Sequence, residues 1–367
     1  MIYIHIPFCK SRCLYCDFFS STANARKEEF VRALKQEMKG RAAELLHARA
    51  NTIYIGGGTP SQLNTEQIRE IFSALRGIVP LEQGAEVTME CNPDDVTEAF
   101  LEGLVDTPVN RVSMGVQTMD DGLLHLLRRR HDSSQARNAV LMLRQAGYSN
   151  ISLDLMYGLP GQTMDMWKRD VDELLSMQVP HLSAYSLQWE EGTPLYRMLE
   201  KGEVAEAPEE LSLEMYRYLV DATGKAGLEH YEISNFAMPN MRARHNNGYW
   251  KNEPYVGLGP GAHSYDGERR RSSNAPDLDA YIQAVGMPQQ EVEVLDDDSF
   301  YEEQVLKGLR TIDGLNLETL LPKYRDYALE MARTHIESGR LTICENVLRL
   351  TEDGIFVSND IMSDMML

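Results

Sequence analysis

The first half of this 367-residue chain alternates short runs of β-branched residues with longer helical patterns. The short runs predict six strands, at residues 2–6, 52–56, 85–90, 111–116, 151–156 and 181–187. Helical periodicity between them predicts helices at residues 26–47, 65–75, 133–146 and 164–177. Strands separated by helices are joined by right-handed crossovers and therefore form a parallel sheet. The alternation predicts an α/β fold built as a partial or complete β/α barrel, with a doubly wound open sheet as the alternative.

The second half of the chain has a different pattern. Residues 209–225 predict a helix rich in Glu and Leu, and the Gly-rich passage 257–263 is too kinked for regular structure. Near the end, helical patterns precede two predicted strands at residues 340–343 and 347–350, which is typical of a small winged-helix-like α+β domain. We therefore divide the chain into three parts, namely a barrel at residues 1–230, a middle segment at 231–290 and a C-terminal domain at 291–367.

The charge balance limits the classes of partner. The chain has 36 Lys and Arg against 56 Asp and Glu, a net charge of −20, whereas nucleic-acid binders present a basic face. We expect no nucleic-acid partner, and we assign most of the charge in the arginine triplets at 128–130 and 269–271 to solvated surface. No apolar stretch is long enough to span a bilayer, and the chain does not open like a signal peptide. We expect a cytoplasmic protein with at most peripheral membrane contact.

Three cysteines lie within eight residues, directly after the first predicted strand. Cys9, Cys13 and Cys16 have the spacing C-x₃-C-x₂-C, so one tight loop presents three soft thiolate ligands. A [4Fe–4S] cluster held by protein alone takes four cysteines, and three would leave one iron open to an outside ligand. A zinc site with a fourth ligand such as His5, a chance cluster and a disulfide are the alternatives.

Polar residues end several of the predicted strands. Glu90 closes the third strand, Gln117 follows the fourth, and Asp154 lies on the fifth. In β/α barrels the carboxyl ends of the strands meet at one face, where ligand-binding groups gather. The glycines in Gly-Gly-Gly-Thr-Pro, residues 56–60, follow the second strand and allow a ligand to approach the backbone closely. A solvent-facing strand end and a tight turn are the simpler explanations of each feature taken alone.

Residues 3–18, with the sequence Tyr-Ile-His-Ile-Pro-Phe-Cys-Lys-Ser-Arg-Cys-Leu-Tyr-Cys-Asp-Phe, resemble the cysteine motif of radical S-adenosylmethionine enzymes. More narrowly, they resemble the oxygen-independent coproporphyrinogen III oxidases and their relatives, the HemW heme chaperones. The resemblance implies a partial (β/α)6 barrel, a [4Fe–4S] cluster on the three cysteines, and S-adenosylmethionine chelating the open iron.

The same resemblance assigns further cofactor contacts, residue by residue. It places the first S-adenosylmethionine beside the aromatic residues of the cysteine motif, the Gly-Gly-Gly-Thr-Pro segment and one carboxylate: Tyr3, Tyr15, Gly57, Gly58, Thr59 and Glu90. Gln117, Arg129 and Asp154 match positions that contact a second S-adenosylmethionine in the oxidases. Whether a second molecule binds this chain is left open by the sequence.

Three features favour the chaperones over the oxidases within this resemblance. The oxidases have a further cysteine two residues after the third, where this chain has Phe18. The chain also begins eight residues before Cys9, so we expect it to lack the N-terminal extension that helps to close the oxidase active site. Finally, residues 232–237 and the sequence His-Asn-Asn-Gly-Tyr-Trp at 245–250 look like segments of HemW, the latter its heme motif.

His245 in that motif is a candidate heme ligand. A neutral imidazole is a common axial ligand of heme iron, and the neighbouring Tyr249 and Trp250 offer flat apolar surfaces to a macrocycle. Without the resemblance, a histidine that hydrogen-bonds backbone in a capped loop is the simpler interpretation.

The resemblance implies a heme chaperone that binds a [4Fe–4S] cluster, S-adenosylmethionine and heme, and delivers the heme to acceptor heme proteins, of which respiratory membrane complexes are the expected class. The alternatives are an oxygen-independent coproporphyrinogen III oxidase and a zinc-bound structural or interaction protein.

Overall fold

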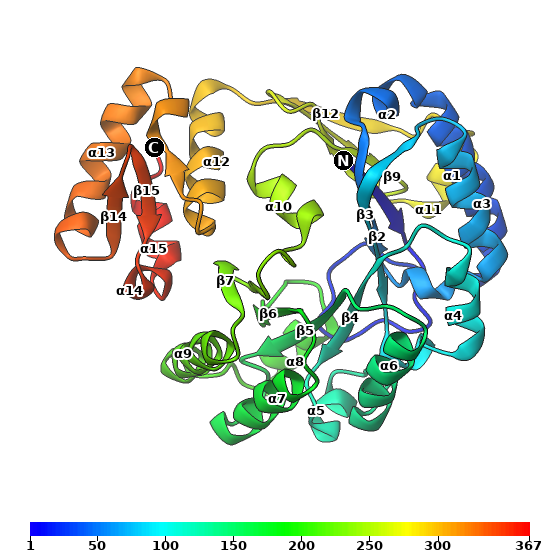
Figure 1. Ribbon diagram of the computed structural model, residues 1–367, viewed down its shortest axis with the longest axis horizontal. Helices are drawn as coiled ribbons and strands as arrows, with labels where there is room; N and C mark the ends of the chain where they lie inside the picture. The colour runs from blue at the N-terminus through cyan, green and yellow to red at the C-terminus, as the bar shows by residue number, and fades with distance from the viewer.

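Six parallel strands lie side by side in chain order at the centre of the structure, a computed structural model that describes residues 1–367 (Figure 1). The strands are β1 (Ile2–Ile6), β2 (Ala50–Gly57), β3 (Leu81–Cys91), β4 (Arg111–Gln117), β5 (Ile151–Tyr157) and β6 (His181–Ser186). The helices that connect or follow them are α1 (Lys27–Gly40), α2 (Ala42–Ala48), α3 (Thr65–Arg76), α4 (Glu98–Val105), α5 (Asp121–Leu126), α6 (Ser133–Gln145), α7 (Met164–Ser176), α8 (Pro194–Glu200) and α9 (Glu209–Lys225). The predicted α/β fold with a parallel sheet is confirmed.

The sheet has nine strands in the order β7-β8-β6-β5-β4-β3-β2-β1-β9 and stays open, because β7 and β9 are edge strands that do not pair with each other. β7 (Glu229–Glu232) and β8 (Asn235–Ala237) form an antiparallel extension beside β6, whereas β9 (Val256–Leu258) pairs with β1 in parallel. The prediction that the passage 257–263 has no regular structure is wrong at both of its ends. Gly257 belongs to β9, where a Cβ would lie only 2.0 Å from the carbonyl oxygen of His263, so glycine permits this strand rather than breaking it.

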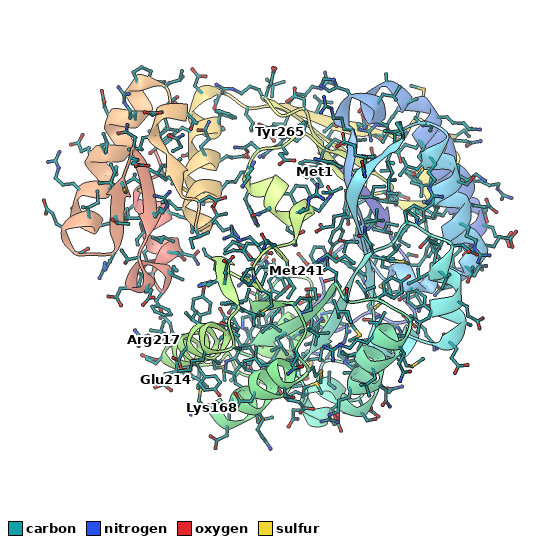
Figure 2. All side chains as sticks on the ribbon, in the orientation of Figure 1. Met1, Lys168, Glu214, Arg217, Met241 and Tyr265 are labelled. Carbon is teal, nitrogen blue, oxygen red and sulfur yellow. The ribbon has the colours of Figure 1, made fainter.

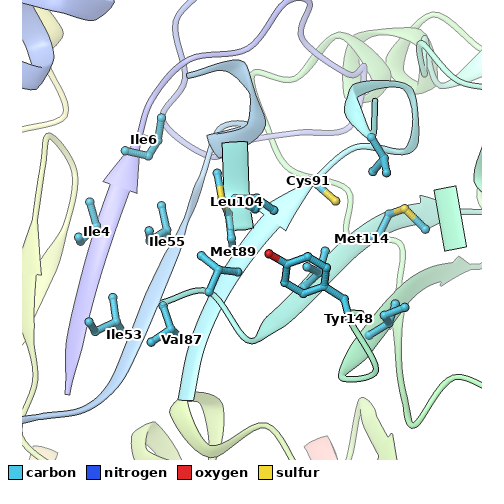
Figure 3. Close-up of a cluster of buried hydrophobic side chains, with 14 of the residues drawn as sticks. Ile4, Ile6, Ile53, Ile55, Val87, Met89, Cys91, Leu104, Met114 and Tyr148 are labelled. Atoms are coloured by element: carbon cyan, nitrogen blue, oxygen red, sulfur yellow. The ribbon is translucent and has the colours of Figure 1, made fainter. Parts of the chain in front are cut away.

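Alternate residues of the parallel strands face the outer helices and form the main apolar core. Figure 3 shows this layer, in which Ile53 and Ile55 of β2 lie beside Val87 and Met89 of β3. Leu104 of α4 belongs to the same buried cluster. The intervening residues point to the other face of the sheet, because side chains alternate along a strand. The inner face is therefore free to hold polar side chains.

The C-terminal part of the chain forms smaller antiparallel sheets and a separate apolar core. Its elements are α10 (Arg244–Trp250), β10 (His263–Tyr265), β11 (Arg270–Asn274), α11 (Leu278–Gln283), β12 (Gln290–Val294), α12 (Asp297–Arg310), β13 (Leu315–Asn316), α13 (Pro322–Glu337), β14 (Leu341–Cys344), β15 (Val347–Leu350), α14 (Glu352–Ile355) and α15 (Ser358–Asp364). The last two strands follow the helices as the winged-helix-like prediction requires, and α12 lies beside α10 (Figure 1). None of the helices is both long enough and apolar enough to cross a bilayer.

A buried carboxylate joins the first helix to the middle of the chain. The predicted single helix at residues 26–47 is wrong, since it is broken at Arg41 between α1 and α2. Glu37 has no exposed surface and accepts hydrogen bonds from four groups: Arg41 Nη1 (3.2 Å), Asn274 Nδ2 (2.8 Å), Tyr281 Oη (2.6 Å) and the Gly259 N–H (2.8 Å). Arg41 in turn donates to the carbonyl of Gly257 at 2.6 Å. The break between α1 and α2 thus places Glu37 and Arg41 beside β9 and the turn that follows it, and their hydrogen bonds fix the position of this segment.

Replacing Glu37 is expected to destabilise the fold strongly. Glu37→Ala leaves Arg41 buried without its inner partner and removes three further hydrogen bonds, which should lower the free energy of unfolding by about 3–5 kcal/mol. Glu44 is the other ion-pair partner of Arg41 but its side chain is 53% exposed, so Glu44→Ala should cost about 1 kcal/mol or less. Urea unfolding of the two variants measures the difference, and equal losses would contradict the importance of the buried network.

Candidate functional site

A cavity of about 570 Å³ lies at the carboxyl ends of the parallel strands and is lined by the cysteine loop and by residues of β2 to β6. It brings together most of the residues that the sequence singled out: Cys9, Cys13, Tyr15, Cys16, Gly57, Gly58, Thr59, Glu90, Gln117, Arg129 and Asp154. Tyr3 and His245 do not line it. Segments separated by more than 100 residues thus share one cavity, which is within the size range of small-molecule sites.

The cysteine loop is held by backbone hydrogen bonds. The Cys9 N–H donates to the carbonyl of Ser21 at 2.9 Å, and the side chain of Asn24 donates to the carbonyl of Cys9 at 3.0 Å. All three cysteines are free and half-buried, and burial raises the pKa of Cys9 and, to about 11, that of Cys16. Protonated thiols do not bind metals, so binding of a metal centre here would have to release their protons.

The positions of the possible metal ligands limit which kind of metal centre the site could hold. No group of three or more His, Cys, Asp or Glu side chains in the chain converges as ligands of a single ion would. His5, the candidate fourth zinc ligand, does not line the cavity, and its ring nitrogens contact Tyr3 Oη (3.0 Å) and the carbonyl of Phe19 (2.9 Å). Cys9, Cys13 and Cys16 all line the cavity, and soft thiols are ligands that the irons of a cluster accept.

The glycine segment after β2 lies against the end of β1. The Gly58 N–H donates to the carbonyl of Ile6 and the Thr59 N–H to that of Phe8, both at 2.8 Å. A Cβ on Gly58 would lie 2.9 Å from each of these two oxygens, so no larger residue fits without moving the backbone. Because Phe8 immediately precedes Cys9, this contact fixes the start of the cysteine loop relative to β2.

Arg129 connects the cysteine loop to β4. Its guanidinium donates to Cys13 Sγ at 3.3 Å, to Asn92 Oδ1 at 2.6 Å and to the carbonyl of Gly115 at 2.6 Å. The neighbouring Arg130 forms ion pairs with Asp94 and Asp95 at 3.0 and 2.9 Å. The expectation that this arginine triplet is solvated surface is therefore wrong for its last two members, which line the cavity.

Two carboxyl groups on the inner face have raised pKa values. Glu90 accepts hydrogen bonds from Tyr54 Oη at 2.7 Å and from the Gly57 N–H at 3.1 Å, yet burial raises its pKa from 4.5 to about 7. Asp154 accepts a hydrogen bond from Ser113 Oγ at 3.3 Å, and burial raises its pKa to about 6. Both groups therefore change charge near neutral pH, and a bound cation would favour their ionised forms.

His245 lies in α10, behind the cavity. Its ring has no exposed surface, with Nδ1 2.8 Å from Thr52 Oγ1 and Nε2 2.9 Å from Tyr249 Oη. Burial lowers its pKa to about 3, so the ring is neutral. The partners of the ring are side chains rather than the backbone groups of the simpler interpretation. Within α10 only Asn246 reaches the cavity.

Tyr3 lies behind the same wall. Its ring stacks on that of Tyr54, with a centroid separation of 6.2 Å and an interplanar angle of 27°. The ring of Tyr54 also contacts the ring of His245, at 5.3 Å between centroids. Tyr54 therefore lies between the region of the heme motif and Glu90.

Sequence reasoning missed several residues that line the cavity, among them Arg111, Ser113 and Ser183. A usable signal was present in β4, whose sequence Arg-Val-Ser-Met-Gly-Val-Gln alternates polar or small residues with apolar ones. That period of two assigns Arg111, Ser113 and Gly115 to the same face as Gln117.

The raised pKa of Glu90 predicts a pH dependence of stability. Because the folded chain holds this proton up to about pH 7 whereas the unfolded chain loses it near pH 4.5, unfolding releases a proton between these values. The free energy of unfolding of the ligand-free protein should therefore fall as the pH rises from 5 to 8, and Glu90→Gln should remove about 2–3 kcal/mol of that fall. Urea unfolding at several pH values measures it.

The control for this measurement is Glu214→Gln, a charge-matched change on the exposed side of α9 (Figure 2). It should leave the pH dependence as in the unmodified chain. A Glu90→Gln profile that runs parallel to that of the unmodified protein would contradict the raised pKa.

Comparison with known proteins identifies the family. Residues 3–174 match the model of the radical SAM superfamily. The heme chaperone HemW of Lactococcus lactis is 37% identical over 325 residues, which are 88% of this chain and 84% of that protein. The heme chaperone HemW of Bacillus subtilis is 35% identical over 98% of this chain and 97% of its own.

Among solved structures, coproporphyrinogen III oxidase from Escherichia coli, described as a radical SAM enzyme, superposes with a TM-score of 0.86. The match covers 99% of this chain and 89% of that one at 21% identity, so it establishes a shared fold. With the curated relatives, it identifies the open six-stranded arrangement as a radical SAM barrel. The chain belongs to the HemW family of the radical SAM superfamily.

Proposed function

We propose that this protein is a heme chaperone of the HemW type, which holds a [4Fe–4S] cluster and S-adenosylmethionine in the cavity and binds heme as cargo. The observation that carries the proposal is the identity of 35–37% to two proteins named as heme chaperones over most of the chain. The three cysteines of the family motif support it, because all of them line the same cavity.

In this proposal Cys9, Cys13 and Cys16 would hold a [4Fe–4S] cluster and leave one iron for S-adenosylmethionine. When bound, the two groups supply one-electron chemistry at a sulfonium centre. The backbone of residues 57–59, Glu90 and Tyr15 would hold this cofactor, and Tyr3 would support the site through its contact with Tyr54. Gln117, Arg129 and Asp154 form the place for a second molecule of S-adenosylmethionine.

Heme binds near α10 in this proposal, with His245 as the iron ligand. Both ring nitrogens of His245 are engaged in this conformation, so ligation requires the ring to leave Thr52 or Tyr249. Trp250 lies on the same helix and stacks against the guanidinium of Arg310 at 4.7 Å. The heme then passes to an acceptor heme protein, for which we propose the respiratory membrane complexes, with membrane contact at most peripheral.

Anaerobic purification followed by spectroscopy of iron and added heme tests this function. A chaperone should be brown after reconstitution with iron and sulfide, bind S-adenosylmethionine with a change in its paramagnetic resonance spectrum, and bind heme. Incubation of the reduced protein with S-adenosylmethionine and coproporphyrinogen III should yield no protoporphyrinogen. Formation of that product would contradict the chaperone function and favour the oxidase, and a colourless protein with one tightly held zinc would contradict both.

Removal of one cysteine ligand should abolish cluster binding. Cys13→Ala leaves two thiols, too few to hold a cluster, so the iron content should fall to a small fraction of that of the unmodified protein. Cys344→Ala is the matched control, because Cys344 is exposed on β14 in the C-terminal domain. Iron analysis and visible absorption measure the outcome. Full iron content in Cys13→Ala would show that the cysteine loop has another role.

Two substitutions in α10 test the heme ligand. His245→Ala should weaken heme binding at least about tenfold and change the absorption spectrum of bound heme, because the axial ligand is lost. Tyr249→Phe removes only the hydroxyl group that binds Nε2, so heme affinity should rise by about two- to tenfold, the contribution of one hydrogen bond. Heme titration of both variants, with iron content as the check on the cluster, measures this. An unchanged spectrum in His245→Ala would remove His245 as the ligand.

A further inference from the structure

A buried arginine on the inner face of the sheet makes no hydrogen bond and no ion pair within the chain. Arg111 is 2% exposed and ranks among the largest fully buried side chains, and it lines the cavity. Its Nε has no hydrogen-bond partner, and Arg111 takes part in none of the side-chain hydrogen bonds or ion pairs of the structure. A buried charge is normally paired, so a cation left unpaired beside a cavity indicates a missing anionic partner.

The residues around Arg111 do not supply that partner. Glu90 is engaged by Tyr54 and by the Gly57 N–H, and Asp154 by Ser113. Arg111 acts on both carboxyl groups only at longer range, by lowering their pKa values against the larger effect of burial.

A second polar group without a partner lies next to it. Thr88 is the register partner of Arg111 on β3, and its fully buried hydroxyl group has no hydrogen bond. Adjacent residues of parallel strands at the same register point to the same side of the sheet. The hydroxyl group and the guanidinium therefore lie on the same side of the sheet, but only Arg111 lines the cavity, several residues before the strand end that bears Gln117.

We propose that Arg111 binds the carboxylate of a ligand at the inner end of the cavity. The guanidinium is planar and presents parallel N–H groups that match the two oxygens of a carboxylate. This inference rests on the proposed function, which supplies two ligands with an alkyl carboxylate that is not bound to the cluster: a second molecule of S-adenosylmethionine and the propionates of heme. The chemistry recognised is the same in both, and the experiment separates the two sources.

The experiment compares each ligand with a form that lacks the carboxylate. The probes are S-adenosylmethionine and its decarboxylated analogue, and heme and its dimethyl ester, each titrated into reconstituted holoprotein. Arg111→Gln should weaken binding of one carboxylate-bearing probe by about 10- to 100-fold, the contribution of a charge-assisted bidentate pair, and leave its carboxylate-free form unchanged. Loss confined to S-adenosylmethionine or to heme identifies the source.

Two further variants make the test independent of folding defects. Arg111→Lys keeps the charge but not the fork of donors, so it should weaken the same probe by less than Arg111→Gln does. Arg325→Gln makes the same charge change at an exposed position on α13 and should alter no affinity. Urea unfolding confirms that the compared variants are folded, and Arg111→Lys alone is compared with the unmodified protein if Arg111→Gln does not fold.

The outcomes distinguish this inference from the proposed function. If the unmodified protein binds S-adenosylmethionine and heme, and Arg111→Gln changes neither affinity, the carboxylate site is wrong and the chaperone proposal stands. Equal losses for a probe and its carboxylate-free form would also overturn the site, since they indicate a disturbed cavity. An unmodified protein that binds neither ligand contradicts the proposed function, and the carboxylate site with it.

Discussion

The alternation of side chains along six parallel strands determines most of this structure. One set of residues, such as Ile55 and Met89, meets the outer helices and forms the apolar core, while the other set faces inward. Because the sheet stays open between β7 and β9, its inner face does not have to be filled by a packed apolar core, and it holds Glu90, Arg111 and Asp154 around one cavity. The same feature of the backbone thus separates a stabilising face from a ligand-binding face.

The strands could be predicted because their signals are local. A buried parallel strand needs a run of β-branched and apolar residues, and all six runs lie within strands of the structure or one residue beyond their ends. The break at Arg41 could not be predicted in this way, since it depends on hydrogen bonds to Gly257 and Ser264 more than 200 residues away. β9 was missed for the same reason, because the short sequence Val-Gly-Leu, followed by a second glycine, has no strand signal without β1 beside it.

The sequence predicted which residues at the strand ends line the candidate site, but not the contacts that several of these side chains make in the folded chain. Motif residues at the strand ends line the cavity, because parallel strands bring their carboxyl ends to one face. Local sequence does not indicate which members of an arginine triplet point inward: only the resemblance singled out Arg129, and nothing in the sequence indicated that Arg130 also lines the cavity. Nor does it indicate that His245 is enclosed by Thr52 and Tyr249, since Thr52 comes from a strand almost 200 residues earlier.

The pairing of β1 between β2 and β9 has a consequence for biosynthesis. During synthesis, β1 gains its neighbour β2 after about 50 further residues, but its other edge stays open until Val256 and Leu258 have emerged. An uncovered strand edge can pair with other chains, and non-local pairing is slow to form. The long edge of β1 is therefore exposed during most of translation, and the three-residue strand β9 replaces it at the edge of the sheet only late.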